Sequence, residues 1–343
     1  MSKQFKPAFG LSNRHIQTLY SSFFRKSLKL DFKIEKFELP DGDGVDCYWY
    51  EKPDKNSSKP IVILFHGLAG SYKSPYIQGT MQKLSELGFS SVVMHFRGCS
   101  GEANKLPRAY HSGDTGDSTL WIQNVKKNFP TSKLFAIGYS LGGNMLLKYL
   151  GEKKEDSLLD GAISVSAPLQ LDICANKMDK GFSKVYQKHL ITNLKLPLEE
   201  KYNKHDMESL IGLKKESIKK IRTFWEFDEV YTAPIHGFES AKDYYTKSSS
   251  KQFLKDIKTP TLIIHSIDDP FMTPEILPNK DELSESIKLE ISSNGGHVGF
   301  ISGSLFKPSF WLEDRVTKYF KSLNLLSNSG FYITLTFFII SKI

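Results

Sequence analysis

The chain has 343 residues, a length that suits one large domain or two small ones with a substantial core. Hydrophobic residues make up 40% and charged residues 24%, with no low-complexity tract or internal repeat, so a disordered or repetitive protein is excluded and a folded, soluble one is expected. The net charge is +8, but the lysines are interleaved with acids and accompany no nucleic-acid-binding motif, so nucleic acid is not an expected partner.

The cysteines and the N-terminus bear on location. Cys47, Cys99 and Cys174 lie far apart without CxxC spacing, which indicates neither a zinc site nor a disulfide framework and fits reduced thiols in a cytosol. The first residues, MSKQFKPAFGLSNRHIQTLY, contain early lysines but not the apolar region of a secretion signal. We therefore expect a cytoplasmic protein.

Short apolar runs predict the strands. Residues 33–51, KIEKFELPDGDGVDCYWYE, predict two strands around a turn at residues 41–44, which is a hairpin pattern. Continuous apolar runs favour strands that are buried on both faces of a parallel sheet. Six such runs follow the hairpin: PIVILFHG, SSVVMHFRG, KLFAIGYS, GAISVSAP, PTLIIHSIDD and IKLEISSNGGH.

Helical patterns separate these runs. They are SPYIQGTMQKLSELGF, DTGDSTLWIQNVKKNF, GGNMLLKYLGEKK and, after the last strand, FWLEDRVTKYFKSL. This alternation predicts a three-layer α/β fold with a mostly parallel central sheet and helices on both faces, formed as a single domain by residues 1–329. Residues 169–258 are helical in pattern without a convincing strand, and an insertion this long predicts a functional cap.

The C-terminal segment 330–343, GFYITLTFFIISKI, is nearly all apolar or β-branched. It is shorter than the ~20 apolar residues that a membrane-spanning helix needs. A buried terminal strand, an interfacial anchor and a reading-frame artefact stay open as alternatives. Membrane contact therefore stays open as an alternative, and no spanning helix indicates it.

The segment GYSLGG, residues 138–143, lies between an apolar run and a helical pattern. A G-x-S-x-G sequence on a sharp strand-to-helix turn exposes the serine hydroxyl, because only glycines tolerate the close packing around it. The following amide, of Leu141, would begin a helix, where unpaired N–H groups favour an oxyanion. We predict Ser140 as a nucleophile and Leu141 as an oxyanion donor, the alternative being a glycine-rich helix start capped by serine.

A serine hydroxyl needs a base to become a useful nucleophile. His297, in SSNGGHVGF, stands just past the last predicted core strand in a glycine-flanked loop. Hydrolases whose serine lies on such a strand-to-helix turn, called a nucleophile elbow, present their base at this place. Other histidines lie within apolar runs, as His95 and His265 do, or in the predicted cap, as His189 and His205 do. His297 is therefore the predicted base.

The base needs an acid that holds its tautomer and stabilises the imidazolium. Asp268 and Asp269 end the strand before the one that leads to His297, which gives the chain order Ser, Asp, His. Counting three positions from the small residue Ser266 gives Asp269, and Pro270 restricts the backbone just before it. Asp268 is then a turn acid that caps backbone amides, and the reverse assignment is the alternative.

A second oxyanion donor is expected in the loop after PIVILF, in HGLAGS. Gly67 allows a tight turn there, and the Leu68 amide is the predicted donor. His66 is expected to orient this loop and to take no part in the chemistry.

Seven blocks of the sequence resemble the YheT-like branch of the α/β-hydrolases, over about residues 10–323. They are SNRHIQTL, HGLAGSYKSPYIQG, VMHFRGCSGEANKLPRAYHSG, GYSLGGNMLLKYLG, EFDEVYTAPIHGF, LIIHSIDDPFM and GGHVGF. The resemblance implies an esterase-type hydrolase with no metal or organic cofactor and a triad of Ser140, Asp269 and His297. RHIQTL and FRGCSG carry no chemistry that we can derive, and Arg97 in the latter is expected in a structural salt bridge or as a brace near the site.

The predicted function is hydrolysis of a carboxylic ester with a short- to medium-length acyl part, through an acyl-enzyme on Ser140, and the expected partner is a small acyl ester. An acyltransferase, with acyl-CoA as a candidate donor, is an alternative because only the acceptor differs. A non-catalytic binding module with this fold is the alternative from another class; it is disfavoured because serine, histidine and acid are all present.

Overall fold

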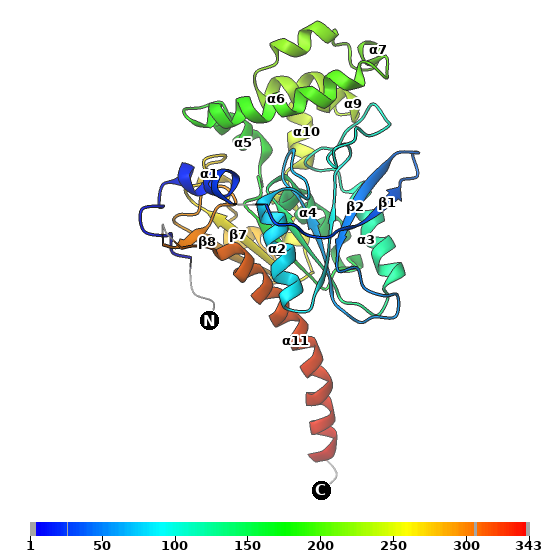
Figure 1. Ribbon diagram of the computed structural model, residues 1–343, viewed down its shortest axis with the longest axis vertical. Coiled ribbons are helices and arrows are strands. Elements are labelled where there is room, and N and C mark those ends of the chain that lie inside the picture. The colour runs from blue at the N-terminus through cyan, green and yellow to red at the C-terminus, as the bar shows by residue number, and fades with distance from the viewer. Residues whose placement is uncertain (1–4, 26, 305–306, 341–343) are drawn as a thin grey trace.

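A twisted sheet of eight strands forms the centre of the molecule in the order β1-β2-β4-β3-β5-β6-β7-β8 (Figure 1). The computed structural model describes residues 5–25, 27–304 and 307–340. The strands are β1 (Lys33–Glu38), β2 (Gly44–Tyr50), β3 (Ile61–Phe65), β4 (Ser90–Met94), β5 (Leu134–Tyr139), β6 (Gly161–Val165), β7 (Thr261–Ser266) and β8 (Ile287–Ser292). β1 and β2 form the predicted antiparallel hairpin, β2 is antiparallel to β4, and the strands from β4 to β8 in the sheet are parallel.

Helices cover both faces of the sheet, as predicted. Because strand side chains alternate between faces, β3 contributes to two cores. Ile61, Ile63 and Phe65 pack towards α3 (Gly116–Asn128) and α4 (Leu141–Lys153). Val62 and Leu64 pack towards α2 (Pro75–Glu86) and α11 (Trp311–Ile340). Burial on both faces explains why β3 to β7 are continuous apolar runs, and the three-layer α/β fold is confirmed. The expectation of burial on both faces is wrong for β8, because this edge strand is half-buried to exposed along its length.

Within residues 169–258, all of which the structure describes, every regular element is helical. The elements are α5 (Leu171–Met178), α6 (Ser183–Lys201), α7 (Met207–Ile211), η2 (Lys215–Lys220), α8 (Phe224–Phe227), η3 (Asp228–Thr232), α9 (Ala233–Ile235), α10 (Ala241–Ser248) and η4 (Lys251–Asp256). α6, α7 and α9 lie above one end of the sheet (Figure 1) and share a separate apolar core that includes Ile191, Met207 and Phe227.

The end of this insertion returns to the α/β layers. The Asn144 side chain on α4 donates to the Ser248 carbonyl at 2.8 Å and accepts from the Ser250 amide at 2.9 Å. A β-carbon on Gly151 would lie 2.5 Å from the Phe253 carbonyl oxygen, so η4 packs directly against α4. The exact boundary of a cap within 169–258 stays a prediction.

A short helix and a two-stranded sheet lie outside the eight-stranded sheet. Helix α1 (Arg14–Phe24) begins after Asn13, whose side chain accepts from the His15 and Ile16 amides. Strands β9 (Ile301–Gly303) and β10 (Pro308–Phe310) pair antiparallel beside it. The remaining short turns of helix are η1 (Lys154–Asp156), η5 (Pro274–Ile276) and η6 (Lys280–Glu282).

The apolar C-terminal segment continues α11 as a helix to Ile340, so the alternative of a terminal strand is wrong. α11 extends away from the sheet on the side opposite α6 and α7 (Figure 1). Residues 341–343 of the segment lie outside the described part. In the part of the chain that the structure describes, none of the helices combines the length and apolar character needed to cross a membrane.

Candidate active site

Ser140 occupies the sharp turn between β5 and α4. Its backbone has φ 50° and ψ −119°, a conformation that non-glycine residues rarely adopt outside strained functional turns. A β-carbon on Gly138 would lie 2.3 Å from the Gly142 carbonyl oxygen, and one on Gly142 would lie 2.6 Å from the Phe65 carbonyl oxygen. Both glycines therefore have no room for a side chain, as the elbow pattern predicts.

Three side chains from three distant segments meet at this turn. The Ser140 hydroxyl lies 2.9 Å from His297 Nε2, and His297 Nδ1 lies 2.8 Å from Asp269 Oδ2. Asp269 is 1% exposed, and its other oxygen accepts from the Phe271 amide at 2.8 Å. The Phe271 ring stacks on the imidazole at 4.0 Å between centroids. Packing and hydrogen bonds thus hold the imidazole between hydroxyl and carboxylate.

The adjacent acid has a different partner. Asp268 Oδ1 accepts a hydrogen bond from the Gly296 amide at 2.9 Å, next to His297 in the loop. This is the backbone-capping contact expected of a turn acid. Of the two adjacent carboxylates, only that of Asp269 contacts the imidazole.

The loop after β3 lies against the serine. A β-carbon on Gly67 would be 3.3 Å from Ser140 Cβ, and the amides of Gly67 and Ala69 are taken by the Tyr76 and Tyr110 hydroxyls at 3.0 and 2.9 Å. Among the described residues, the intervening Leu68 amide has no acceptor. Two hydrogen-bonded amides therefore flank the Leu68 amide beside Ser140.

His66 stabilises this loop. Its Nδ1 donates to the Gly67 carbonyl at 2.8 Å, and its Nε2 accepts from the Phe96 amide at 3.2 Å. Complete burial lowers the pKa of His66 to about 3, so the ring is neutral. Both ring nitrogens are thereby committed to backbone groups, in agreement with a role in loop orientation.

Helix α1 holds the His297 loop, a contact that sequence reasoning missed. Thr18 Oγ1 accepts from the His297 amide at 2.9 Å. The fully buried Gln17 side chain donates to the Leu11 carbonyl at 2.6 Å and accepts from the Ile301 amide at 2.7 Å. The RHIQTL block is therefore a brace for the loop, and the only sequence signal for it was the resemblance.

Arg97 forms a buried salt-bridge network. Its Nε and Nη2 donate to the two oxygens of Asp117 at 2.6 and 2.7 Å, and its Nη1 lies 2.8 Å from Asp41 and 3.2 Å from Asp43. These contacts join the β1–β2 turn to the start of α3. Arg97 is thus the structural salt bridge that was expected for the FRGCSG block.

A cavity of about 470 Å³ connects Ser140 to the helical insertion. Its lining is mostly apolar and includes Leu68, Leu141, Met178, Leu194, Phe227 and Phe271. Asp228, in the π-helical turn η3, is a polar group on its wall and accepts from the Thr232 and Tyr245 hydroxyls at 2.6 and 2.7 Å. Burial raises the pKa of Asp228 to about 6.

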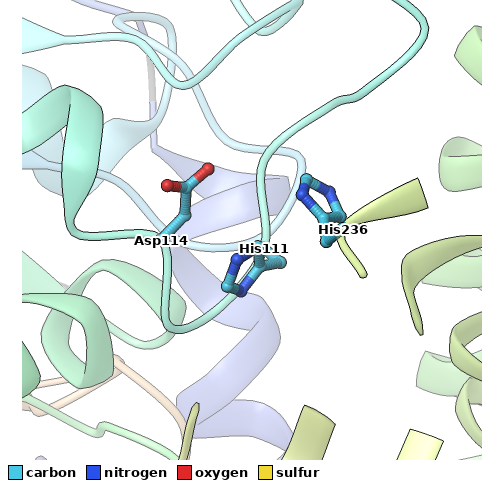
Figure 2. A group of neighbouring side chains, drawn as sticks. All are labelled: His111, Asp114 and His236. Carbon is cyan, nitrogen blue, oxygen red and sulfur yellow. The ribbon is translucent and has the colours of Figure 1, made fainter. Parts of the chain in front are cut away.

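His111, Asp114 and His236 form a cluster whose potential ligand atoms lie within 4.8 Å of one another (Figure 2). Asp114 is paired with Arg108 at 2.5 Å, and His111 Nδ1 accepts from the Gly113 amide at 3.2 Å. Burial, with Arg108 nearby, lowers the pKa of His111 to about 3, and burial beside His111 does the same for His236. The positive charge of the Arg108 guanidinium disfavours a metal cation at this place. The contacts therefore favour a packing role, in which neutral histidines join the loop of His111 to the helical insertion, over a metal centre.

The chain matches the family model described as the alpha/beta hydrolase fold over residues 60–304, which is more than half its length. The chain belongs to the α/β-hydrolase family.

Among its relatives is YheT of Escherichia coli (strain K12), a proposed esterase, with 42% identity over 92% of both chains. The chain therefore lies in the YheT-like branch, which confirms the resemblance of the seven blocks. A second relative is the medium-chain fatty acid ethyl ester synthase/esterase 2 of Saccharomyces cerevisiae, 31% identical over 78% of this chain and 63% of the yeast protein. Family and relatives support hydrolase activity.

The fold is shared with solved structures of low sequence identity. The Pyrococcus furiosus esterase Pf2001 superposes with a TM-score of 0.53 at 17% identity, covering 85% of this chain and 93% of that protein. At this identity the match concerns the fold alone.

Proposed function

We propose that the protein is a serine hydrolase that cleaves carboxylic esters through an acyl-enzyme on Ser140, with His297 as base and Asp269 as its supporting acid. The observation that carries the proposal is the chain of contacts from the Ser140 hydroxyl through the His297 ring to Asp269, at 2.9 and 2.8 Å. It coincides with the positive φ of Ser140 at a helix N-terminus.

In the proposed reaction, Ser140 Oγ attacks the ester carbonyl carbon while its proton passes to His297 Nε2. The carboxylate of Asp269 stabilises the imidazolium through Nδ1. The same proton leaves with the alcohol when the C–O bond breaks, which yields the acyl-enzyme. Water then attacks the acyl carbon and gives a proton to Nε2, which returns it to Ser140 as the carboxylic acid departs.

The amides of Leu68 and Leu141 are proposed to bind the oxyanion. Leu141 is the first residue of α4, where amides lack helical acceptors and the helix dipole is positive. Leu68 supports the proposal because its amide has no acceptor within the described part of the chain and lies between two fixed neighbours in the loop against Ser140. Two such donors would stabilise negative charge that develops only during reaction.

Residues of about 169–258 are proposed as a cap that defines the acyl site. The mostly apolar lining and the volume of about 470 Å³ suit a short- to medium-chain acyl group. Leu68, Leu141 and Phe271 from the α/β layers and Met178 and Phe227 from the insertion border the same space. No metal or organic cofactor is needed for this chemistry.

The test is hydrolysis of p-nitrophenyl acetate, butyrate and octanoate by the purified protein, together with labelling by a fluorophosphonate probe. The wild type should release p-nitrophenol and take up the probe, and Ser140→Ala should do neither. Ser209→Ala, at an exposed serine on α7, is the matched control and should behave like the wild type. An inactive, unlabelled wild type, or an active Ser140→Ala, would contradict the proposal.

An acyltransferase is the second candidate, because the yeast relative is named as both an ethyl ester synthase and an esterase. The acyl-enzyme would be the same, and an alcohol would replace water as acceptor. Adding ethanol to the butyrate assay decides between them: ethyl butyrate should form if the second candidate is right. Exclusive release of butyric acid at every ethanol concentration would remove it.

A further inference from the structure

Helix α1 carries an apolar stripe that faces away from the protein. Ile16 is 42% exposed, and Phe23 and Phe24 are each 72% exposed. Ile16 and Phe23 are seven residues apart and lie on one side of the helix, and Phe24 is its exposed last residue. Gln17, which holds the His297 loop, is about 100° around the helix from Ile16 and is fully buried. The exposed stripe is therefore not part of the contacts by which α1 braces the site.

The start of α6 extends this surface. Phe182 is 52% exposed and Val185 is 57% exposed. The His15 ring on α1 packs against Phe182 with 4.4 Å between centroids and is hydrogen-bonded to the Tyr186 hydroxyl at 3.0 Å. α1 and one end of α6 lie on the same side of the molecule (Figure 1). We call the surface formed by Ile16, Phe23, Phe24, Phe182 and Val185 the docking face.

Basic residues border the docking face. Lys180, just before α6, and Lys184 and Lys188 within it are exposed, and the nearby Asp179 is paired with Lys184 at 3.6 Å. Exposed aromatic and aliphatic side chains with a fringe of lysines and arginines are the combination that binds anionic membrane surfaces. A second copy of this chain would instead bring two positive fringes together, which disfavours self-association through this face.

The docking face is connected to the candidate site by a row of ring contacts. Phe182 packs against Tyr186 at 5.7 Å, Tyr186 packs against Phe271 at 5.0 Å, and Phe271 stacks on His297 at 4.0 Å. Phe271 also lines the cavity that contains Ser140. A surface bound at the docking face would therefore lie three rings from the imidazole of the site.

From these contacts we propose that the docking face binds the surface of an anionic lipid bilayer, with the aromatic side chains in the headgroup region and the basic fringe on the phosphates. Binding itself is independent of the catalytic roles proposed above, so it can be tested without an activity measurement.

The experiment is co-sedimentation of the full-length protein with phosphatidylcholine vesicles, with and without phosphatidylglycerol. The wild type should partition onto the anionic vesicles, and less so as salt is raised. Phe23→Ser with Phe24→Ser should lower the partition coefficient by about tenfold or more, because two exposed aromatic rings no longer enter the interface. Lys180→Glu with Lys184→Glu should lower it by a similar factor on anionic vesicles only.

Leu210→Ser is the matched control, since Leu210 is 49% exposed on α7, away from α1 in Figure 1, and should bind like the wild type. Circular dichroism of each variant verifies folding, and the lysine variant decides the question if the phenylalanine variant does not fold. Three results would overturn the proposal: a wild type that stays in the supernatant, an equal loss in Leu210→Ser, or a dimer that Phe23→Ser with Phe24→Ser dissociates. If esters are not hydrolysed but vesicles are bound, only the proposed function fails.

Discussion

Replacing Asp269 by asparagine should abolish most activity while leaving the site geometry nearly unchanged. The reason lies in the Phe271 amide, which donates to Asp269 Oδ1 at 2.8 Å. An asparagine carbonyl would keep this contact and turn its NH₂ group towards His297 Nδ1. The imidazole would then accept at Nδ1 and carry its proton on Nε2. It could no longer take the proton of Ser140.

The magnitude follows from this wrong tautomer. Loss of the correct tautomer in a serine triad costs about 10⁴ in kcat. At 1.36 kcal/mol per tenfold change, this is about 5 kcal/mol of transition-state stabilisation. Asp269 is 1% exposed, so water has little access to replace the carboxylate. We therefore expect a loss in kcat of about three to four orders of magnitude, with a smaller change in KM.

Asp268→Asn is the matched control, because the neighbouring acid accepts from the Gly296 amide at 2.9 Å and an asparagine carbonyl can do the same. Asp268→Asn should retain activity within about threefold of the wild type, because the hydrogen bond to the Gly296 amide is kept with a neutral acceptor. The assay is the steady-state hydrolysis of p-nitrophenyl butyrate by both variants. Equal losses in the two variants, or a loss confined to Asp268→Asn, would refute the assignment of Asp269.

Three further predictions concern the elbow, the brace and the cavity wall. Gly142→Ala should lower the thermal unfolding temperature, because its β-carbon would lie 2.6 Å from two carbonyl oxygens. Gly116→Ala is the control and should leave the temperature unchanged, because the nearest atom to its β-carbon would be 3.7 Å away. Equal unfolding temperatures for the two variants would contradict the packing constraint at Gly142. Thr18→Val should lower kcat about tenfold by leaving the His297 amide unpaired, and Thr18→Ser should restore it; an unchanged kcat in the valine variant would disprove the brace. Asp228 has a pKa raised from 3.8 to about 6, so its contribution to stability is present below pH 4 and is lost as the pH rises through 6. Urea unfolding should therefore show that the free energy of unfolding of the wild type falls by about 3 kcal/mol relative to that of Asp228→Asn between pH 4 and pH 7. A difference in unfolding free energy that does not change with pH would exclude the raised pKa of Asp228.

Local patterns were sufficient for much of the fold. The hairpin at β1 and β2 was predictable from two strand-like runs around an Asp-Gly turn, and each of the buried strands β3 to β7 was predictable from a continuous apolar run. The elbow at Ser140 was predictable because its constraint is local: the glycines two positions away must pack within the same turn. Such features depend on neighbours in sequence, which a linear pattern contains.

Other features depend on segments that are far apart in sequence. The Thr18 hydroxyl and the His297 amide are separated by 279 positions, and no pattern within RHIQTL indicates that partner. The apolar segment after residue 330 was compatible with strand or helix in isolation, and the structure continues it as part of α11. The exposure of Phe23 and Phe24 also emerged only with α1 in place, because burial is a property of packing.

The sequence by itself thus determined the layers of the sheet, the order of Ser140, Asp269 and His297, and the strained turn that presents the serine. The tertiary structure alone decided that the imidazole lies within hydrogen-bonding distance of both partners, that Asp268 turns to a backbone amide, and that α1 supports the loop. The physical reason is the distance along the sequence over which each interaction acts. Backbone strain and side-chain periodicity act within one turn or strand, whereas hydrogen-bond distances of about 3 Å between remote segments exist only after the whole core has packed.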